Sequence, residues 1–264
     1  MEHPAPGELR PVTGFASVQL ARNPGPMTLD GTNTWLVGLP GEPARAVIDP
    51  GPSEPEHLRA VADRGPVSLV LLTHHHGDHT DGVAEFVEMT GAAVRAWDPQ
   101  LCRGAEPLRD GEELDAAGVR LRVLATPGHT RDSVSFAGEH GGERVVFTGD
   151  SVLGRGTTVV AHPDGHLGSY VDSLRKLAAL PAGTRALPGH GPELPDAAES
   201  AAGYLQHREQ RLDQVRAVVR EIGPQVTARQ VVEIVYADVD PSVWPAAEWS
   251  VRAQLTYLEE QGEL

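Results

Sequence analysis

Short apolar runs alternate with helical patterns along the chain up to about residue 187. This alternation is typical of β-strands that are connected through helices. The predicted strands are Phe15–Leu20, Asn33–Gly38, Arg45–Asp49, Ser68–Thr73, Ala93–Ala96, Val119–Ala125, Ser133–Ala137, Arg144–Thr148 and Thr184–Leu187, and the predicted helices are Pro55–Arg64, Asp81–Thr90 and Ser169–Leu180. Some strands are separated only by Gly-rich turns such as Gly138–Gly142, so antiparallel hairpins must accompany the crossovers. The pattern therefore predicts mixed sheets and disfavours a purely parallel one.

The pattern changes beyond Leu187–Pro195, where strand signals stop and three helical stretches follow. The first is Ala198–Ile222, and its apolar stripe consists of Tyr204, Leu205, Leu212, Val215 and Val219. The second begins at Thr227 with a capping-box spacing to Gln230, and the third follows Pro245. We therefore expect two domains: an α/β domain over residues 1–198 and a small helical domain over residues 199–264.

Composition narrows the class of protein. The chain has 264 residues, of which 40% are hydrophobic, which is enough to bury a sizeable core. No apolar run approaches the ~20 residues that a membrane-spanning helix needs, and the first residues lack the apolar segment of a signal peptide. We therefore expect a cytoplasmic protein with no membrane partner. Because Cys102 is the only cysteine, an intramolecular disulfide and an all-thiolate metal site are both excluded.

Charge bears on the partners of the protein. There are 22 Lys and Arg residues against 37 Asp and Glu residues, and the formal net charge is −15. This balance disfavours long-range attraction to polyanions such as RNA, although it leaves room for a local basic groove.

The strongest chemical signal is the segment Thr73–His79, which follows an apolar strand and holds four histidines and one aspartate within six residues. Imidazoles and carboxylates at the end of a buried strand must be desolvated, so each needs a partner, and a metal ion can serve them all. His129, Asp150 and His190 each follow a β-rich run and a glycine. A glycine lets the backbone turn sharply beneath a ligand. His75 lies between two of these residues, and we expect it to face the opposite side.

These residues resemble the motif of the metallo-β-lactamase superfamily, His-x-His-x-Asp-His followed by a His, an Asp and a His on later loops. The resemblance implies an α/β (α+β) fold, an αββα sandwich of two mixed sheets with the site at one edge. It implies that His74, His76 and His129 hold one metal ion, that Asp78, His79 and His190 hold a second, and that Asp150 bridges both. Two zinc ions fit an imidazole-rich set best, with manganese or iron as alternatives for the more oxygen-rich second site.

This ligand set implies a hydrolase. Two metal ions about 3.5–4 Å apart can share a hydroxide and also polarise the group that it attacks. Asp78 and Asp150 are the candidate catalytic residues, because they can orient the water or take its proton as well as bind metal.

Three further segments resemble the lactamase-β-like protein 2 group: Asn23–Val37, Gly154–Thr158 and Tyr204–Arg208 with the helices that follow it. The resemblance implies a winged-helix-like domain at the C-terminal end. Members of this group include endoribonucleases specific for single strands and relatives that cleave thioesters of carrier-bound polyketides. The candidate substrate contacts are Asn33 and Arg155 within these segments, and His162 and His166 in a polar loop after Asp150.

The most specific prediction is therefore phosphodiester hydrolysis of single-stranded RNA. In that case Arg208, Arg211, Arg216 and Arg220 should contact the RNA backbone; alternatively they form a solvated flank paired with Glu209 and Asp213. The alternative function is hydrolysis of a small thioester, ester or lactone, as in polyketide thioesterases or glyoxalase II. A more remote alternative is a non-catalytic, metal-stabilised binding module. β-Lactamase activity is disfavoured because those enzymes typically place Cys where this chain has Asp150.

Overall fold

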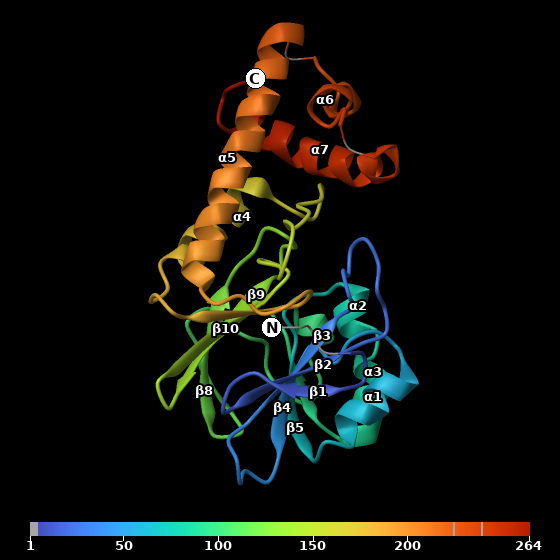
Figure 1. Ribbon diagram of the computed structural model, residues 1–264, viewed down its shortest axis with the longest axis vertical. Coiled ribbons are helices and arrows are strands. Elements are labelled where there is room, and N and C mark those ends of the chain that lie inside the picture. The colour runs from blue at the N-terminus through green and yellow to red at the C-terminus, as the bar shows by residue number, and fades with distance from the viewer. Residues whose placement is uncertain (1–4, 224, 239) are drawn as a thin grey trace.

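The computed structural model describes residues 5–223, 225–238 and 240–264. Two sheets lie face to face with helices on their outer faces, and helices complete the C-terminal part (Figure 1). The strands are β1 (Leu9–Pro11), β2 (Ala16–Leu20), β3 (Asn33–Val37), β4 (Arg45–Ile48), β5 (Val67–Leu71), β6 (Ala93–Arg95), β7 (Glu113–Ala116), β8 (Val119–Ala125), β9 (Val134–His140), β10 (Glu143–Gly149) and β11 (Arg185–Pro188). The helices are α1 (Pro55–Ala62), α2 (Gly77–Thr80), α3 (Val83–Thr90), α4 (Leu167–Ala178), α5 (Ala197–Ile222), α6 (Ala228–Val235) and α7 (Trp244–Glu260), with 3₁₀ turns at Pro99–Leu101 and Pro241–Val243.

Both sheets are mixed. The first has the order β1-β2-β3-β4-β5-β6, in which β5 pairs in parallel with β4 and with β6 and the other pairs are antiparallel. The second has the order β11-β10-β9-β8-β7, in which only the β10 and β11 pair is parallel. The predicted αββα sandwich of two mixed sheets is confirmed.

Strand periodicity explains the uninterrupted apolar runs at positions 35–37 of β3 and 145–147 of β10. In β3, Trp35 and Val37 face the other sheet, whereas Leu36 faces the layer that contains α1 and α3. In β10, Phe147 faces the first sheet and Val146 faces the layer that contains α4 and α5. Because successive side chains of a strand point to opposite faces, the part of a strand that packs on both sides is apolar at successive positions.

The structure adds elements that the sequence pattern did not predict. All nine predicted strands are present, but β1 and β7 were missed. β1 has three residues and ends in a proline, and β7 alternates exposed and buried positions over only four residues, so neither forms an apolar run. The predicted helix over Asp81–Thr90 begins two residues later, at Val83, and a separate short helix, α2, lies in what was expected to be a loop.

All three predicted C-terminal helices are present, although the third begins at Trp244, before Pro245 rather than after it. Asp196 caps α5 by accepting hydrogen bonds from the backbone N–H groups of Ala198 and Glu199, and the capping box of Thr227 and Gln230 begins α6. The first part of α5 packs against α4 within one hydrophobic cluster, so this helix belongs to both parts of the molecule. The domain boundary at residues 198 and 199 stays a prediction. Among the described helices, none combines the length and apolarity needed to cross a membrane.

His57, on α1, is a buried histidine outside the motif segments. It is 4% exposed, and its Nε2 lies 2.9 Å from the Thr34 hydroxyl. Burial lowers the pKa of His57 from 6.5 to about 4. Between these two values the unfolded chain binds more protons than the folded chain, so the folded state is destabilised as pH falls from 6.5 towards 4.

We predict that His57→Gln, which cannot titrate but can still bond to Thr34, weakens this acid sensitivity. Relative to wild type, the loss of unfolding free energy between pH 6.5 and 4 should shrink by about 3 kcal/mol. Urea unfolding of chelator-treated protein at several pH values measures this difference. His140→Gln, at an exposed histidine on β9, is the control and should keep the wild-type slope. An unchanged slope in His57→Gln would contradict the prediction.

Candidate metal centre

The candidate ligands lie where four strands end at one edge of the sandwich. β5 in the first sheet leads into His74, His76 and α2, while β8, β10 and β11 in the second sheet lead into His129, Asp150 and His190. The last three strands run in the same direction, so their carboxyl ends share one edge. This edge is where α/β sheets commonly bind ligands.

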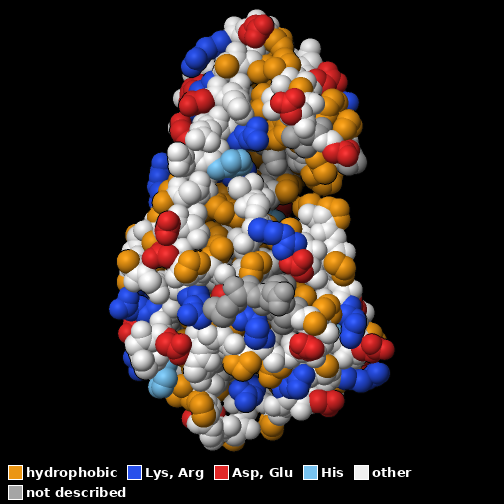
Figure 2. All heavy atoms as spheres, viewed as in Figure 1, with side chains coloured by type: hydrophobic (Ala, Val, Ile, Leu, Met, Phe, Trp, Pro, Cys, Tyr) orange, Lys and Arg blue, Asp and Glu red, His pale blue; other side chains and the backbone are white. Residues whose placement is uncertain are grey.

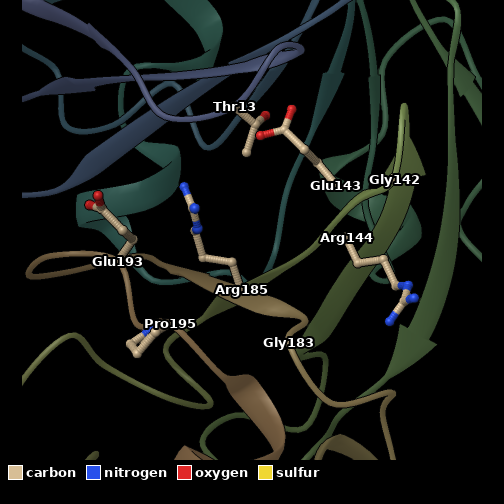
Figure 3. A pocket seen from close by; sticks show the side chains of 8 residues that line it. All are labelled: Thr13, Gly142, Glu143, Arg144, Gly183, Arg185, Glu193 and Pro195. Carbon is tan, nitrogen blue, oxygen red and sulfur yellow. The ribbon is translucent and has the colours of Figure 1, made fainter.

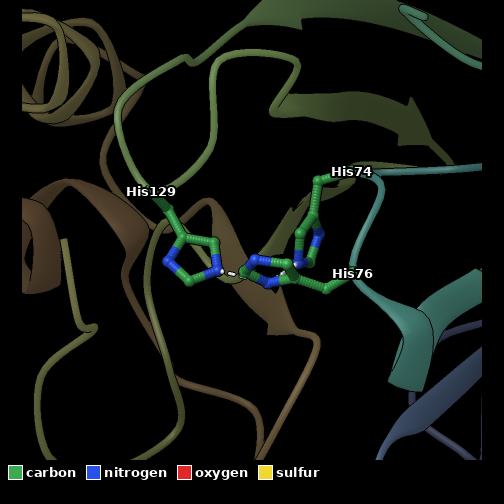
Figure 4. A group of neighbouring side chains, drawn as sticks. All are labelled: His74, His76 and His129. Atoms are coloured by element: carbon green, nitrogen blue, oxygen red, sulfur yellow. Dashed lines mark hydrogen bonds between the residues drawn. The ribbon is translucent and has the colours of Figure 1, made fainter. Parts of the chain in front are cut away.

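The first group of side chains is His74, His76 and His129, whose rings converge (Figure 4). His76 Nδ1 lies 3.1 Å from His74 Nε2 and 3.1 Å from His129 Nε2. Two nitrogens bound to one tetrahedral zinc ion at the usual Zn–N distance would be about 3.3 Å apart. The spacing of these three nitrogens therefore fits a shared metal ion.

The second group is Asp78, His79 and His190. His190 Nε2 lies 3.2 Å from His79 Nε2 and 3.1 Å from Asp78 Oδ2. His79 Nε2 lies 3.6 Å from the same Asp78 oxygen. Two nitrogens and one carboxylate oxygen thus converge on a second point, as the motif resemblance implied.

Asp150 lies between the two groups. Its Oδ2 is 3.7 Å from His129 Nε2 and 3.4 Å from His190 Nε2, and its Oδ1 is 3.5 Å from His79 Nε2. The side chain is buried, and Oδ1 has no hydrogen-bond partner among the described residues. A buried carboxylate oxygen without a partner is costly, so this atom also fits a metal ion.

Backbone carbonyls fix the orientation of two imidazoles. His129 Nδ1 lies 2.7 Å from the Val159 carbonyl oxygen, and His190 Nδ1 lies 3.1 Å from that of Gly31. Because a carbonyl oxygen only accepts, both Nδ1 atoms must donate, and the neutral ring keeps its lone pair on Nε2, which faces the cluster. This arrangement is typical of metal-binding histidines.

Asp49 is a member of the candidate site that the sequence analysis missed. Its buried carboxylate accepts hydrogen bonds from Thr73 N and Thr73 Oγ1 and lies 2.8 Å from His79 Nδ1. Thr73 Oγ1 in turn lies 3.0 Å from His74 Nδ1. Asp49 therefore orients one imidazole of each group. Its only signal in the sequence is its place at the end of a predicted strand.

His74 and His76 in the first group and the histidines of the second group have pKa values shifted in opposite directions. Burial lowers the pKa of His74 well below its usual value and lowers that of His76 to about 4. Burial also opposes the charge of His190, but Asp150 and Asp78 outweigh it and raise its pKa to about 9. The pKa of His79 is raised in the same way by Asp150 and Asp49. In return, the carboxyl pKa values of Asp78 and Asp150 are lowered.

Two glycines make room for these side chains. Gly149 has a φ of +48°, and a side chain there would contact Thr73. A Cβ atom on Gly189 would lie 2.5 Å from Asp150 Oδ1 and 2.7 Å from the His79 ring. Glycine before Asp150 and before His190 is therefore required by the close approach of the loops.

The candidate substrate contacts have different surroundings. Asn33 is 1% exposed, and its amide donates to the carbonyls of Pro188 and Gly191, so it supports the His190 loop from beneath. Arg155 is exposed and forms an ion pair with Asp30. His162 is exposed and lines a pocket together with residues of α6 and α7. His166 caps α4 and lies 3.0 Å from Glu260.

His75, between two candidate ligands, faces away from the cluster. Its Nδ1 lies 2.7 Å from Asp132 Oδ1, which also accepts a hydrogen bond from the Thr130 hydroxyl. The expectation that it faces the opposite side from its neighbours agrees with this contact.

The arginines of α5 make contacts within the protein. Arg208 is 6% exposed, which corrects its assignment to a solvated flank. It lies four residues after Tyr204 and four before Leu212, and this spacing places it on the buried face of α5. Arg211 stacks on the Tyr236 ring, and Arg216 pairs with Glu263, Glu209 and Asp213. The remaining member, Arg220, is exposed.

A pocket outside the cluster lies at the opposite ends of β10 and β11 (Figure 3). Three of its charged side chains have partners in the N-terminal segment. Arg185 donates to the Val12 carbonyl, Glu143 accepts from Gly14 N, and Glu193 pairs with Arg10. These contacts indicate that the charged residues there anchor the N-terminal segment.

Comparison with known families agrees with this site. Residues 27–190 match the metallo-beta-lactamase superfamily, and residues 227–263 match the beta-lactamase associated winged helix domain. The chain therefore belongs to the metallo-β-lactamase superfamily of hydrolases and carries a C-terminal winged helix domain.

Individual relatives extend the similarity to most of the chain. A beta-lactamase-like protein 2 homolog from Drosophila melanogaster is 33% identical over 93% of this chain and 88% of its own length. The crystal structure of a beta-lactamase domain protein from Burkholderia ambifaria has a TM-score of 0.87 at 23% identity, covering 100% of this chain and 91% of its own. A crystal structure of a di-iron-bound protein is 31% identical, with a TM-score of 0.54, and covers 67% of this chain and 94% of its own. The resemblance stated from the sequence is thus confirmed.

We predict that protein purified without chelators contains about two metal ions per chain, because the ligand set exceeds what one tetrahedral ion can use. Elemental analysis measures this ratio. His190→Ala should lower it to about one, whereas His140→Ala, outside the cluster, should leave it unchanged. A folded wild-type protein that binds no metal would contradict the assignment.

Proposed function

We propose that this protein is a dinuclear metal-dependent hydrolase. His74, His76 and His129 would hold one ion, and Asp78, His79 and His190 would hold the other. The observation that carries the proposal is the position of Asp150, whose two oxygens face both groups within 3.7 Å. A residue in that position would hold the two ions at a fixed separation.

Bound ions of this kind supply Lewis acidity and lower the pKa of a coordinated water. The protein would contribute orientation and proton transfer. The Asp150 side chain is 9% exposed and would fix the positions of the two ligand groups relative to each other. The Asp78 side chain is 28% exposed and can exchange protons with solvent. Asp49 would hold His79 in its orientation through the ring Nδ1.

Zinc is the metal that we propose first, because five of the seven candidate ligands are imidazoles. The second group adds carboxylate oxygen, which also suits manganese or iron. The di-iron-bound relative supports iron as the alternative.

For the substrate, the contacts of α5 favour a small ester or thioester over single-stranded RNA. The RNA interpretation needed a row of available arginines, but Arg208 is buried and Arg216 is neutralised by three carboxylates. On the face shown in Figure 2, Lys and Arg side chains over the helical part lie among Asp and Glu side chains. A polyanion would find no continuous basic path on this face, whereas a small acyl substrate needs none.

We predict that the metal-loaded protein hydrolyses model acyl-thioesters, esters or lactones faster than single-stranded RNA. The measurement is a parallel screen of all these substrates at several salt concentrations, with a chelator-treated sample as control. RNA cleavage whose rate falls steeply with salt would instead restore the phosphodiester interpretation. Metal binding without turnover of any substrate would favour a non-catalytic binding module.

We predict that Asp150→Ala abolishes turnover and leaves the fold largely intact. The carboxylate contacts both ligand groups, while the hydrophobic clusters do not include it. Turnover, circular dichroism and metal content together test the prediction. Asp172→Ala, at an exposed carboxylate on α4, is the matched control and should behave as wild type. A wild-type kcat in Asp150→Ala would refute the bridging role.

A further inference from the structure

The irregular loop after Asp150 is held by side chains of α4 and α5. Tyr170 Oη donates to the Ser151 carbonyl at 2.7 Å, and Leu153 N donates to Tyr204 Oη at 3.0 Å. The third contact comes from Arg208, whose Nη2 donates to the Thr158 carbonyl. The loop that carries the bridging carboxylate is therefore fixed from outside, by helices that lead into the C-terminal domain.

Arg208 is the charged member of this set. Its guanidinium lies over the Tyr170 ring, 5.2 Å from the centroid, and Nε is buried without a hydrogen-bond partner among the described residues. Arginine stays protonated at any physiological pH, so this position holds a permanent buried charge. A buried charge opposes folding unless it is well compensated, and an apolar side chain would fill the same helix face at lower cost. The fold thus retains an expensive residue at this contact.

Thr158 connects Arg208 to two candidate ligands. The Thr158 hydroxyl donates to the Asp150 carbonyl oxygen, and this hydrogen bond joins the end of the loop to its beginning. The next residue, Val159, offers the carbonyl that accepts from His129 Nδ1 at 2.7 Å. A hydrogen bond to the Thr158 carbonyl therefore fixes the backbone that holds Asp150 on one side and His129 on the other.

We infer that Arg208 is a positioning residue for the metal centre: through Thr158 it sets the placement of Asp150 and His129. This inference rests on the proposed function only in assigning metal-binding roles to those two residues. It makes the first C-terminal helix part of the active site, although no side chain of that helix is itself a candidate ligand. Loss of an interaction that orients a ligand typically lowers metal affinity or activity by about 10–100-fold.

The test compares Arg208→Met, Arg208→Lys and Arg211→Met. Arg208→Met keeps an unbranched apolar stem on the buried face of α5 and removes the donor and the charge, so it should weaken Zn(II) affinity about tenfold or more and shift the Co(II) absorption spectrum. Arg208→Lys keeps one donor and should lie between Arg208→Met and wild type. Arg211→Met, three residues further on α5, faces Tyr236 instead and should match wild type. Competition with a chromophoric chelator measures the affinity.

A second variant tests the route through Thr158. Thr158→Val removes the hydroxyl at constant shape and should also lower metal affinity. Arg208→Met and Thr158→Val break the same chain of hydrogen bonds. The double variant should therefore lose little more metal affinity than the weaker-binding of the two single variants. Wild-type affinity and spectrum in Arg208→Met would overturn the inference, even if its melting temperature fell. Additive losses, or an equal loss in Arg211→Met, would overturn it too.

These readouts separate the inference from the proposed function. A wild-type protein that binds Co(II) but hydrolyses no substrate would refute the hydrolytic activity, while affinity and spectrum would still decide the role of Arg208. A wild-type protein that binds neither metal would refute both.

Discussion

Bringing five imidazoles and three carboxylates together at one edge of the sandwich, most of them buried, is the constraint on which the rest of the structure depends. The two ligand groups differ in the protonation of their histidines. His74 and His76 are held neutral by burial, whereas His79 and His190 are held charged by Asp49, Asp78 and Asp150. A cation entering the first group meets free lone pairs, but one entering the second must displace protons. The metal affinity of the second group would therefore depend more strongly on pH than that of the first.

Hydrogen bonds at this edge also connect the core between the sheets to the candidate metal site. Trp35 packs on Phe147 in the core between the sheets, and its indole N–H donates to the Pro188 carbonyl at 3.0 Å. Asn33, two residues earlier on β3, donates to the same carbonyl. A strand in the middle of the first sheet thus supports the loop of His190 in the second sheet. The ligands of the second group can keep their spacing only while the sheets keep their register.

Local patterns predicted most of the fold and of the candidate ligands. The His-rich segment after β5 and the glycines before Asp150 and His190 are local features, and local features can be recognised in one sequence. Asp49 and Arg208 acquire their roles from tertiary contacts: Asp49 meets Thr73 and His79 only after the sheet forms. The spacing of Arg208 from Tyr204 and Leu212 indicates the buried face of the helix. Because arginine is charged, it was instead assigned to the exposed flank.

The charge of the whole protein and the charge of the site act over different ranges. Two divalent ions would bring four positive charges to a cluster whose carboxylates, Asp49, Asp78 and Asp150, bring three negative ones. The site itself would therefore attract an anionic or polarised group at close range. At physiological ionic strength this attraction fades within about 8 Å, and beyond that distance the surface decides which molecules approach. The whole chain carries a formal net charge of −15, and most arginines of α5 are already engaged. A compact substrate fits within the range at which the metal site attracts it. A long polyanion would extend beyond that range and be repelled by the acidic surface.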